Sequence, residues 1–214
     1  MNKFWNRFLD ALYPRGITCD VCGGELTDGD DRFISLCPYC YGHMEVNGSG
    51  PQSVAKCDVY SLFKYESVRD LILRCKDGDC PYLATTIGRL LYRYYVEKGL
   101  SADAVCYIPC GKKAFSRRGY DHMELVAKEF SKQSGIPLSH ALERIKEVSD
   151  QTDVDANKRY DNVRGSFVCK EDLTEKNVLL LDDLVTTGAT LSAAIHAIND
   201  ASFCTVRGLT LGKA

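Results

Sequence analysis

The chain has 214 residues, which is enough for one ordinary domain and a small additional segment. Hydrophobic residues make up 45% and charged residues 26%, an average composition for a soluble protein, and no apolar run approaches the length of a membrane span. The formal net charge of -2 gives no overall electrostatic basis for binding to nucleic acids or membranes, so any such binding would need a local patch.

Residues 1–14 place apolar side chains at helical spacing. The apolar residues are Phe4, Trp5, Phe8, Leu9 and Leu12, and the charged residues Lys3, Arg7 and Asp10 interrupt them. These charges leave no apolar core of the kind that signal peptides have. We therefore predict a short helix that docks on the body of the protein, with attachment to a membrane surface as the alternative. We also expect the protein to be cytoplasmic.

Four of the eleven cysteines form two Cys-x-x-Cys pairs, Cys19 with Cys22 and Cys37 with Cys40. Each pair can place two thiolates on one side of a tight turn, and two pairs complete a tetrahedral sulfur site that suits zinc best. Because all four ligands would be sulfur, the metal would be structural and would build the fold of a segment too small for its own core. Redox-active or metal-free pairs are the alternative. The odd number of cysteines argues against a disulfide scaffold.

Residues 45–56 include the sequence Asn-Gly-Ser-Gly-Pro and indicate a linker. We therefore divide the chain into residues 1–50, which contain the N-terminal helix and the zinc-binding cysteines, and residues 51–214, which form the main domain.

The main domain alternates between strand and helix patterns. Strands are predicted at residues 57–65, 104–109, 178–181 and 203–211, and apolar residues at helical spacing mark helices around residues 68–75, 83–94, 123–130 and 191–198. This alternation predicts an α/β fold with a mainly parallel sheet flanked by helices.

Residues 109–119 read as a loop that follows the carboxyl end of a predicted strand. The loop carries four basic residues, Lys112, Lys113, Arg117 and Arg118, which could hold the negative charges of phosphate groups. A solvated basic loop is the alternative. In or beside this loop, Cys110 is either a reactive thiol or a small loop residue, and His122 is either an acid or base or an ordinary histidine at a helix start.

Residues 178–190 carry the most informative pattern in the chain. Four apolar residues predict a strand buried on both faces, and Asp182 and Asp183 follow at its carboxyl end, where open α/β sheets bind ligands. A turn with three threonines and a glycine then leads into a helix, whose free N–H groups can hold a phosphate. An ordinary strand, turn and threonine cap are the alternative. No glycine motif for dinucleotide binding follows any predicted strand.

Residues 178–190 resemble the signature of type I phosphoribosyltransferases, and the whole chain resembles a ComF-type phosphoribosyltransferase, from a family named for bacterial competence. The resemblance rests on the two cysteine pairs, residues 71–76, residues 117–122, Gln151, residues 162–167 and residues 178–190. At residues 120–122 the chain has Tyr-Asp-His, where the family usually has Phe-Asn-Gln.

The resemblance implies a type I phosphoribosyltransferase-like fold with a small N-terminal zinc-binding segment. It also implies a site for phosphoribosyl pyrophosphate (PRPP) and Mg²⁺. The 5-phosphate would bind at Thr186, Thr187, Gly188, Ala189 and Thr190. Asp182 and Asp183 would hold the ribose hydroxyls and help to place Mg²⁺, and Lys112, Lys113, Arg117 and Arg118 would face pyrophosphate.

The expected activity is transfer of the phosphoribosyl group to an unidentified nitrogenous acceptor, with Asp182, Asp183, Lys112 and Lys113 as catalytic residues. The alternative is a non-catalytic, PRPP-responsive adaptor of the DNA-uptake machinery that binds a helicase or single-stranded DNA. A salvage enzyme for a free base would need a base-recognition segment, which the sequence does not reveal.

Overall fold

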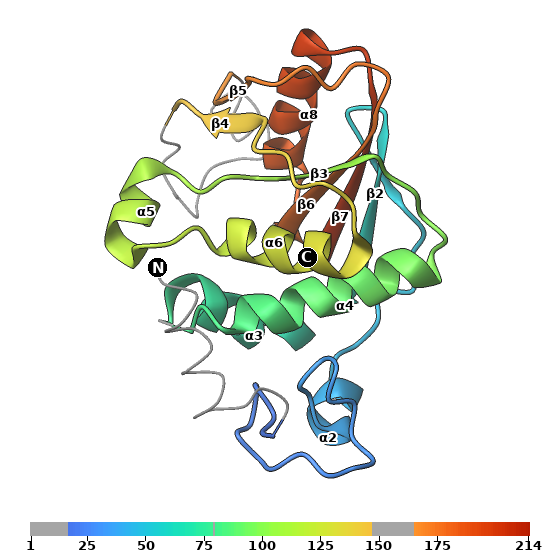
Figure 1. Cartoon of the computed structure of the whole chain (residues 1–214), viewed down its shortest axis with the longest axis vertical. Coiled ribbons are helices and arrows are strands. Elements are labelled where there is room, and N and C mark those ends of the chain that lie inside the picture. Colours follow the sequence, from blue (N-terminus) through green and yellow to red (C-terminus); the bar gives the residue numbers. More distant parts are fainter. Residues whose placement is uncertain (1–16, 79, 147–164) are drawn as a thin grey trace. The chain divides into compact units, whose positions relative to one another are not determined.

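The computed structural model describes residues 17–78, 80–146 and 165–214 (Figure 1). The predicted N-terminal helix, Gln151 and residues 162–164 lie outside the described residues. The chain divides into two compact units, with the boundary between Glu45 and Val46. The first unit contains the short helix α2 (Pro38–Gly42), which begins after Cys37.

The second unit contains a five-stranded sheet in the order β1-β2-β7-β6-β3. The strands are β1 (Gln52–Val54), β2 (Cys57–Lys64), β3 (Ala104–Tyr107), β6 (Asn177–Val185) and β7 (Thr205–Lys213). The β2–β7, β7–β6 and β6–β3 pairs are parallel, and only the edge strand β1 pairs antiparallel. The predicted α/β fold with a mainly parallel sheet is confirmed.

Helices cover both faces of this sheet (Figure 1). The helices of this unit are α3 (Tyr65–Asp77), α4 (Leu83–Glu97), α5 (Lys112–Arg118), α6 (His122–Ser134) and α8 (Ala189–Ala201). Helices α3, α4 and α6 contact strands of the sheet on one face. On the other face, α8 shares a buried apolar cluster with the sheet and with a small two-stranded sheet, β4 (Leu142–Arg144) and β5 (Phe167–Cys169).

The interior strand β6 is buried on both faces, as its apolar run predicts. Val178 and Leu180 belong to the apolar cluster that contains α8. Leu179 and Leu181 are equally buried and, because side chains alternate along a strand, they point to the opposite face. Because β6 pairs with β7 on one side and β3 on the other, the residues at its carboxyl end are held within a rigid framework.

Three sequence predictions need correction. Residues 45–56 are not only a linker, because Gln52–Val54 pair with β2 as the edge strand β1. Residues 109–119 are not only a loop, because Lys112–Arg118 form α5 between Gly111 and Gly119. The third strand does not end at Leu181 but continues to Val185, so Asp182 and Asp183 lie within β6 rather than after it. The sequence analysis also missed the pair β4 and β5.

Candidate functional site

The acid pair lies in the last part of β6, with neighbouring strands on both sides. The carboxyl oxygen Oδ1 of Asp182 accepts a hydrogen bond from the backbone N–H of Asp183 at 3.0 Å. Burial and the charge of Asp183 raise the pKa of Asp182 well above its usual range. Burial also acts on Asp183, but the positive charge of Lys76 and a hydrogen bond from His122 outweigh it and lower the pKa of Asp183. The pair therefore combines a carboxyl group whose pKa is raised with a carboxylate whose pKa is lowered.

Two side chains from the helices on one face of the sheet contact Asp183. Nε2 of His122, at the start of α6, lies 3.0 Å from Oδ2 of Asp183, and Nζ of Lys76, on α3, lies 3.7 Å from the same oxygen. An ionised carboxylate only accepts hydrogen bonds, so Nε2 of His122 carries the proton. Nδ1 of His122 is buried and has no hydrogen-bond partner within the described parts of the chain.

His122 is thus a buried partner of the acid pair, and not an ordinary histidine exposed at a helix start. The sequence analysis considered His122 as an acid or base or as an ordinary histidine, but not as a partner of Asp183, and it assigned no role to Lys76. No local pattern could have revealed the contact, because 61 residues separate His122 from Asp183.

The threonine turn joins β6 to α8, as predicted. Thr186 is exposed, Thr187 and Thr190 are partly buried, and Gly188 and Ala189 are buried. Thr187 Oγ1 accepts a hydrogen bond from the backbone N–H of Ala189 at 3.4 Å. The turn presents the N-terminus of a helix of 13 residues, which favours negative charge.

Gly188 has a φ of 79°, in the left-handed region that favours glycine. A Cβ at this position would lie 2.9 Å from Cγ2 of Val54 on β1. The edge strand that the sequence analysis missed therefore packs directly against the turn and fixes its backbone.

The four basic residues of α5 have different surroundings. Nη2 of Arg117 and Nη2 of Arg118 each lie 2.7 Å from Oδ1 of Asp77, at the end of α3. The side chain of Arg118 is only 7% exposed, whereas Lys112 and Lys113 are exposed at the first turn of α5. The four basic residues therefore fall into two groups: two exposed lysines at the start of α5, and two arginines at its end that pair with the same carboxylate.

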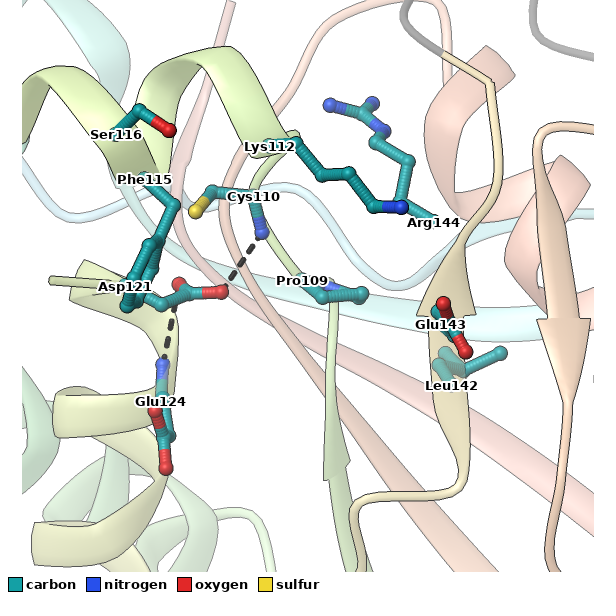
Figure 2. A pocket seen from close by; sticks show the side chains of 10 residues that line it. All are labelled: Pro109, Cys110, Lys112, Phe115, Ser116, Asp121, Glu124, Leu142, Glu143 and Arg144. Atoms are coloured by element: carbon teal, nitrogen blue, oxygen red, sulfur yellow. Dashed lines mark hydrogen bonds between the residues drawn. The ribbon is translucent and has the colours of Figure 1, made fainter.

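A pocket of about 430 Å³ lies between α5, the start of α6 and β4 (Figure 2). Ten residues line it: Pro109, Cys110, Lys112, Phe115, Ser116, Asp121, Glu124, Leu142, Glu143 and Arg144. Asp121 connects two of its walls, because it accepts hydrogen bonds from the backbone N–H of Cys110 at 2.8 Å and of Met123 at 3.0 Å.

Cys110 lies in this pocket, but its thiol is not activated. Burial and the nearby charge of Asp121 raise the pKa of Cys110 to about 12. The thiol is therefore protonated at neutral pH, and of the two alternatives for Cys110 the structure supports a small loop residue.

The four cysteines of the first unit form a compact cluster. The Sγ atoms of Cys19, Cys22, Cys37 and Cys40 all lie within 4.8 Å of one another, and those of Cys22 and Cys37 are 3.8 Å apart. A tetrahedral zinc site with Zn–S bonds of about 2.3 Å has sulfur atoms about 3.8 Å apart, so the cluster fits zinc.

The surroundings of Cys19 and Cys40 shift the pKa values of these two thiols in opposite directions. Burial acts to raise the pKa of Cys19, but backbone N–H groups around Cys22 and Cys37 lower it to about 7. Burial and the neighbouring thiols raise the pKa of Cys40. Metal binding would have to displace the Cys40 proton, which a divalent cation at the centre of the cluster does electrostatically.

Residues 126–212, which include the acid pair and the threonine turn, match the phosphoribosyl transferase domain. The chain is also 29% identical to Competence protein F of Haemophilus influenzae in an alignment 216 positions long that covers 90% of each protein. The two matches confirm the resemblance of the chain to ComF-type phosphoribosyltransferases, and residues 126–212 are similar to a phosphoribosyl transferase domain.

Solved structures that match part of the chain include glutamine PRPP amidotransferase from B. subtilis and purine phosphoribosyltransferase from Pyrococcus horikoshii. The first is 19% identical with a TM-score of 0.40, and the match covers 58% of this chain and only 25% of that chain. The second is 15% identical with a TM-score of 0.38, and the match covers 61% of this chain and 83% of that chain. Within the described ranges, no helix has the length and apolar character needed to cross a membrane.

Proposed function

We propose that the chain binds PRPP and Mg²⁺ at residues 182–190 and transfers the phosphoribosyl group to a nitrogenous acceptor, with release of pyrophosphate. The observation that carries this proposal is the continuity of β6, the threonine turn and α8. One unbroken segment presents two carboxyl groups and a helix N-terminus at the same edge of the sheet. The phosphoribosyl transferase domain match spans this segment.

In the proposed complex, the five residues of the turn hold the 5-phosphate through backbone N–H groups and threonine hydroxyls. These residues are Thr186, Thr187, Gly188, Ala189 and Thr190. The ionised Asp183 accepts a hydrogen bond from one ribose hydroxyl and the neighbouring Asp182 contacts the other, so the two carboxyl groups suit a diol.

Mg²⁺ prefers carboxylate and phosphate oxygens, and the ionised Asp183 fits that preference. Bound Mg²⁺ would offset the negative charge of the pyrophosphate group. His122 and Lys76 keep Asp183 ionised and fix its orientation from two different helices.

The proposed transfer forms a bond between the acceptor nitrogen and the anomeric carbon while the bond from that carbon to pyrophosphate oxygen breaks. The electron pair leaves with pyrophosphate, and the proton of the nitrogen passes to solvent. Because the transition state resembles an oxocarbenium ion, positioning and charge stabilisation matter more than a protein nucleophile. We assign Lys112 and Lys113 to pyrophosphate. Arg117 and Arg118 would have to leave Asp77 to reach it.

Calorimetry with PRPP and Mg²⁺ tests the binding site. Thr187→Val should weaken PRPP binding about tenfold or more, because a hydrogen bond to a charged group contributes about 1.5–3 kcal/mol. Thr205→Val is the matched control, since Thr205 is exposed at the start of β7. Equal PRPP affinity in the two variants would mean that the 5-phosphate binds elsewhere.

Pyrophosphate release with PRPP, Mg²⁺ and a panel of bases, amines and single-stranded DNA tests for turnover. An acceptor that stimulates release, together with loss of release in the Lys112→Ala, Lys113→Ala variant, would support the enzyme. If no acceptor exceeds the background rate while PRPP changes the affinity for single-stranded DNA or a helicase, the protein is the non-catalytic adaptor. The name of the Haemophilus relative supports a role in competence in either case.

We also propose that Cys19, Cys22, Cys37 and Cys40 bind one structural zinc ion. Such a site needs reduced thiols, which agrees with the cytoplasmic location that we propose for the protein. Elemental analysis of protein purified without added metal should find one zinc per chain. The Cys19→Ser, Cys37→Ser variant should lose it and Cys204→Ser should retain it. An unaltered fold in a zinc-free double variant would contradict the structural role.

A further inference from the structure

The pocket between α5, α6 and β4 has apolar walls that a phosphate group does not need. Pro109, Phe115 and Leu142 line it, and Phe115 is 50% exposed although it is a large aromatic residue. Figure 2 shows Phe115 and Asp121 on one side of the pocket and the β4 residues on the other. The volume of about 430 Å³ lies within the range of small-molecule sites. These walls favour a ligand with a flat, apolar body.

The three carboxylates that line the pocket already have partners. Asp121 accepts the backbone hydrogen bonds described above, Glu124 lies 2.6 Å from the Nζ of Lys128, and Glu143 pairs with Lys170. The acidic residues of the pocket thus each have a hydrogen-bond or ion-pair partner within the protein.

The two cations of the pocket, Lys112 and Arg144, have no such ion pairs among the described residues. The guanidinium of Arg144 lies 5.1 Å from the centre of the Phe167 ring, and its Nε is buried without a hydrogen-bond partner among the described residues. A buried donor without a partner is costly, so a ligand that accepts a hydrogen bond there would bind favourably. Lys112 is assigned to pyrophosphate, whereas the contacts proposed above for PRPP do not use Arg144.

The pocket adjoins the acid pair. Asp121 in its wall directly precedes His122, whose Nε2 contacts Asp183. The positive charge of Arg144 also acts on both Asp182 and Cys110, and partly offsets the rise in their pKa values. A ligand in the pocket would therefore lie beside the sugar that the acid pair is proposed to hold.

We propose that this pocket binds the acceptor, and that the acceptor is a heteroaromatic ring with an anionic substituent such as a carboxylate. The ring would pack against Phe115 and Leu142, and the anionic group would pair with Arg144. This assignment rests on the proposed function, and it names the class of acceptor that the transfer reaction uses.

Matched pairs of small molecules test the proposal in calorimetry with the full-length chain. Orotate and uracil differ by one carboxylate, and nicotinate and nicotinamide differ by the charge of one group. In the presence of PRPP and Mg²⁺, at least one carboxylated ring should bind about tenfold more tightly than its neutral partner, as expected for a hydrogen-bonded charge pair. No preference for the carboxylate in either pair would overturn the proposal.

Two variants locate the binding. Arg144→Gln should remove the preference for the carboxylate, and Phe115→Ala should weaken the binding of the whole ring. Arg69→Gln is the matched arginine control, on the exposed surface of α3, and Phe203→Ala is the aromatic control, because Phe203 is 89% exposed. Equal affinities in the variants and their controls would overturn the proposal.

Inorganic pyrophosphate is the competing occupant. If Arg144→Gln weakens pyrophosphate as much as the carboxylated ring, and Phe115→Ala weakens neither, the pocket serves pyrophosphate and the proposal fails. A parallel titration with PRPP distinguishes a failure of the acceptor proposal from a failure of the proposed function. Intact PRPP binding without carboxylate preference refutes the acceptor class alone, whereas absent PRPP binding refutes the proposed function and with it the acceptor role.

Discussion

Gly188→Ala should destabilise the protein through two separable effects at the turn between β6 and α8. The φ of 79° at Gly188 costs a residue with a Cβ about 1–2 kcal/mol. The new Cβ would also lie 2.9 Å from Cγ2 of Val54, and such overpacking costs about 1–3 kcal/mol. The expected loss in the free energy of unfolding is therefore about 2–5 kcal/mol.

Urea denaturation followed by circular dichroism measures this loss, and a matched glycine separates its parts. Gly135 has a φ of 73° with no atom within 4 Å of its ideal Cβ, so Gly135→Ala should show the backbone cost alone. Adding Val54→Ala to Gly188→Ala should recover about 1–3 kcal/mol relative to the sum of the single changes. Equal destabilisation by Gly188→Ala and Gly135→Ala, or no coupling to Val54, would refute the claim that β1 packs against the turn.

Three further predictions concern titratable groups. Cys110 should resist alkylation by iodoacetamide at pH 7.5 in the folded protein and react once unfolded, as followed by peptide mass spectrometry, because its pKa is raised to about 12. Glu129→Gln should cost about 1.5–3 kcal/mol, because it removes the negative charge that accepts the hydrogen bond of the partly buried Arg89 at 2.8 Å. Burial acts to raise the pKa of Glu129, but hydrogen bonds from Arg89 and Gln133 outweigh it and lower this pKa. The contribution of Glu129 to stability is therefore present above about pH 4.3, the unfolded pKa, and is lost as the pH falls through the folded pKa. In urea titrations between pH 3 and pH 7, the Glu129→Gln variant should lose less of its free energy of unfolding on acidification than the unchanged protein. The same pH profile in both proteins would contradict this prediction. His122→Leu should weaken PRPP binding more than His122→Gln, because glutamine retains an N–H donor for Asp183, and equal effects of the two changes would count against this role.

The sequence alone determined the features that depend on neighbours along the chain. The apolar run of β6, the threonine turn and the helix after it follow from local periodicity and turn chemistry, and the structure has all three in the predicted order. The two cysteine pairs likewise predicted the cluster in the first unit, because each pair is a local turn and only four sulfur atoms need to meet.

Only the tertiary structure decided which residues surround the acid pair and line the pocket. His122 and Asp183 are 61 residues apart, and Arg117 and Asp77 are 40 residues apart, so no periodic pattern connects either pair. β1 was missed because three residues at a sheet edge carry too little pattern to stand out from a glycine-rich segment. Local sequence fixes which element forms, but which side chains meet depends on how the helices pack across the sheet, and that packing brings His122 and Lys76 to Asp183.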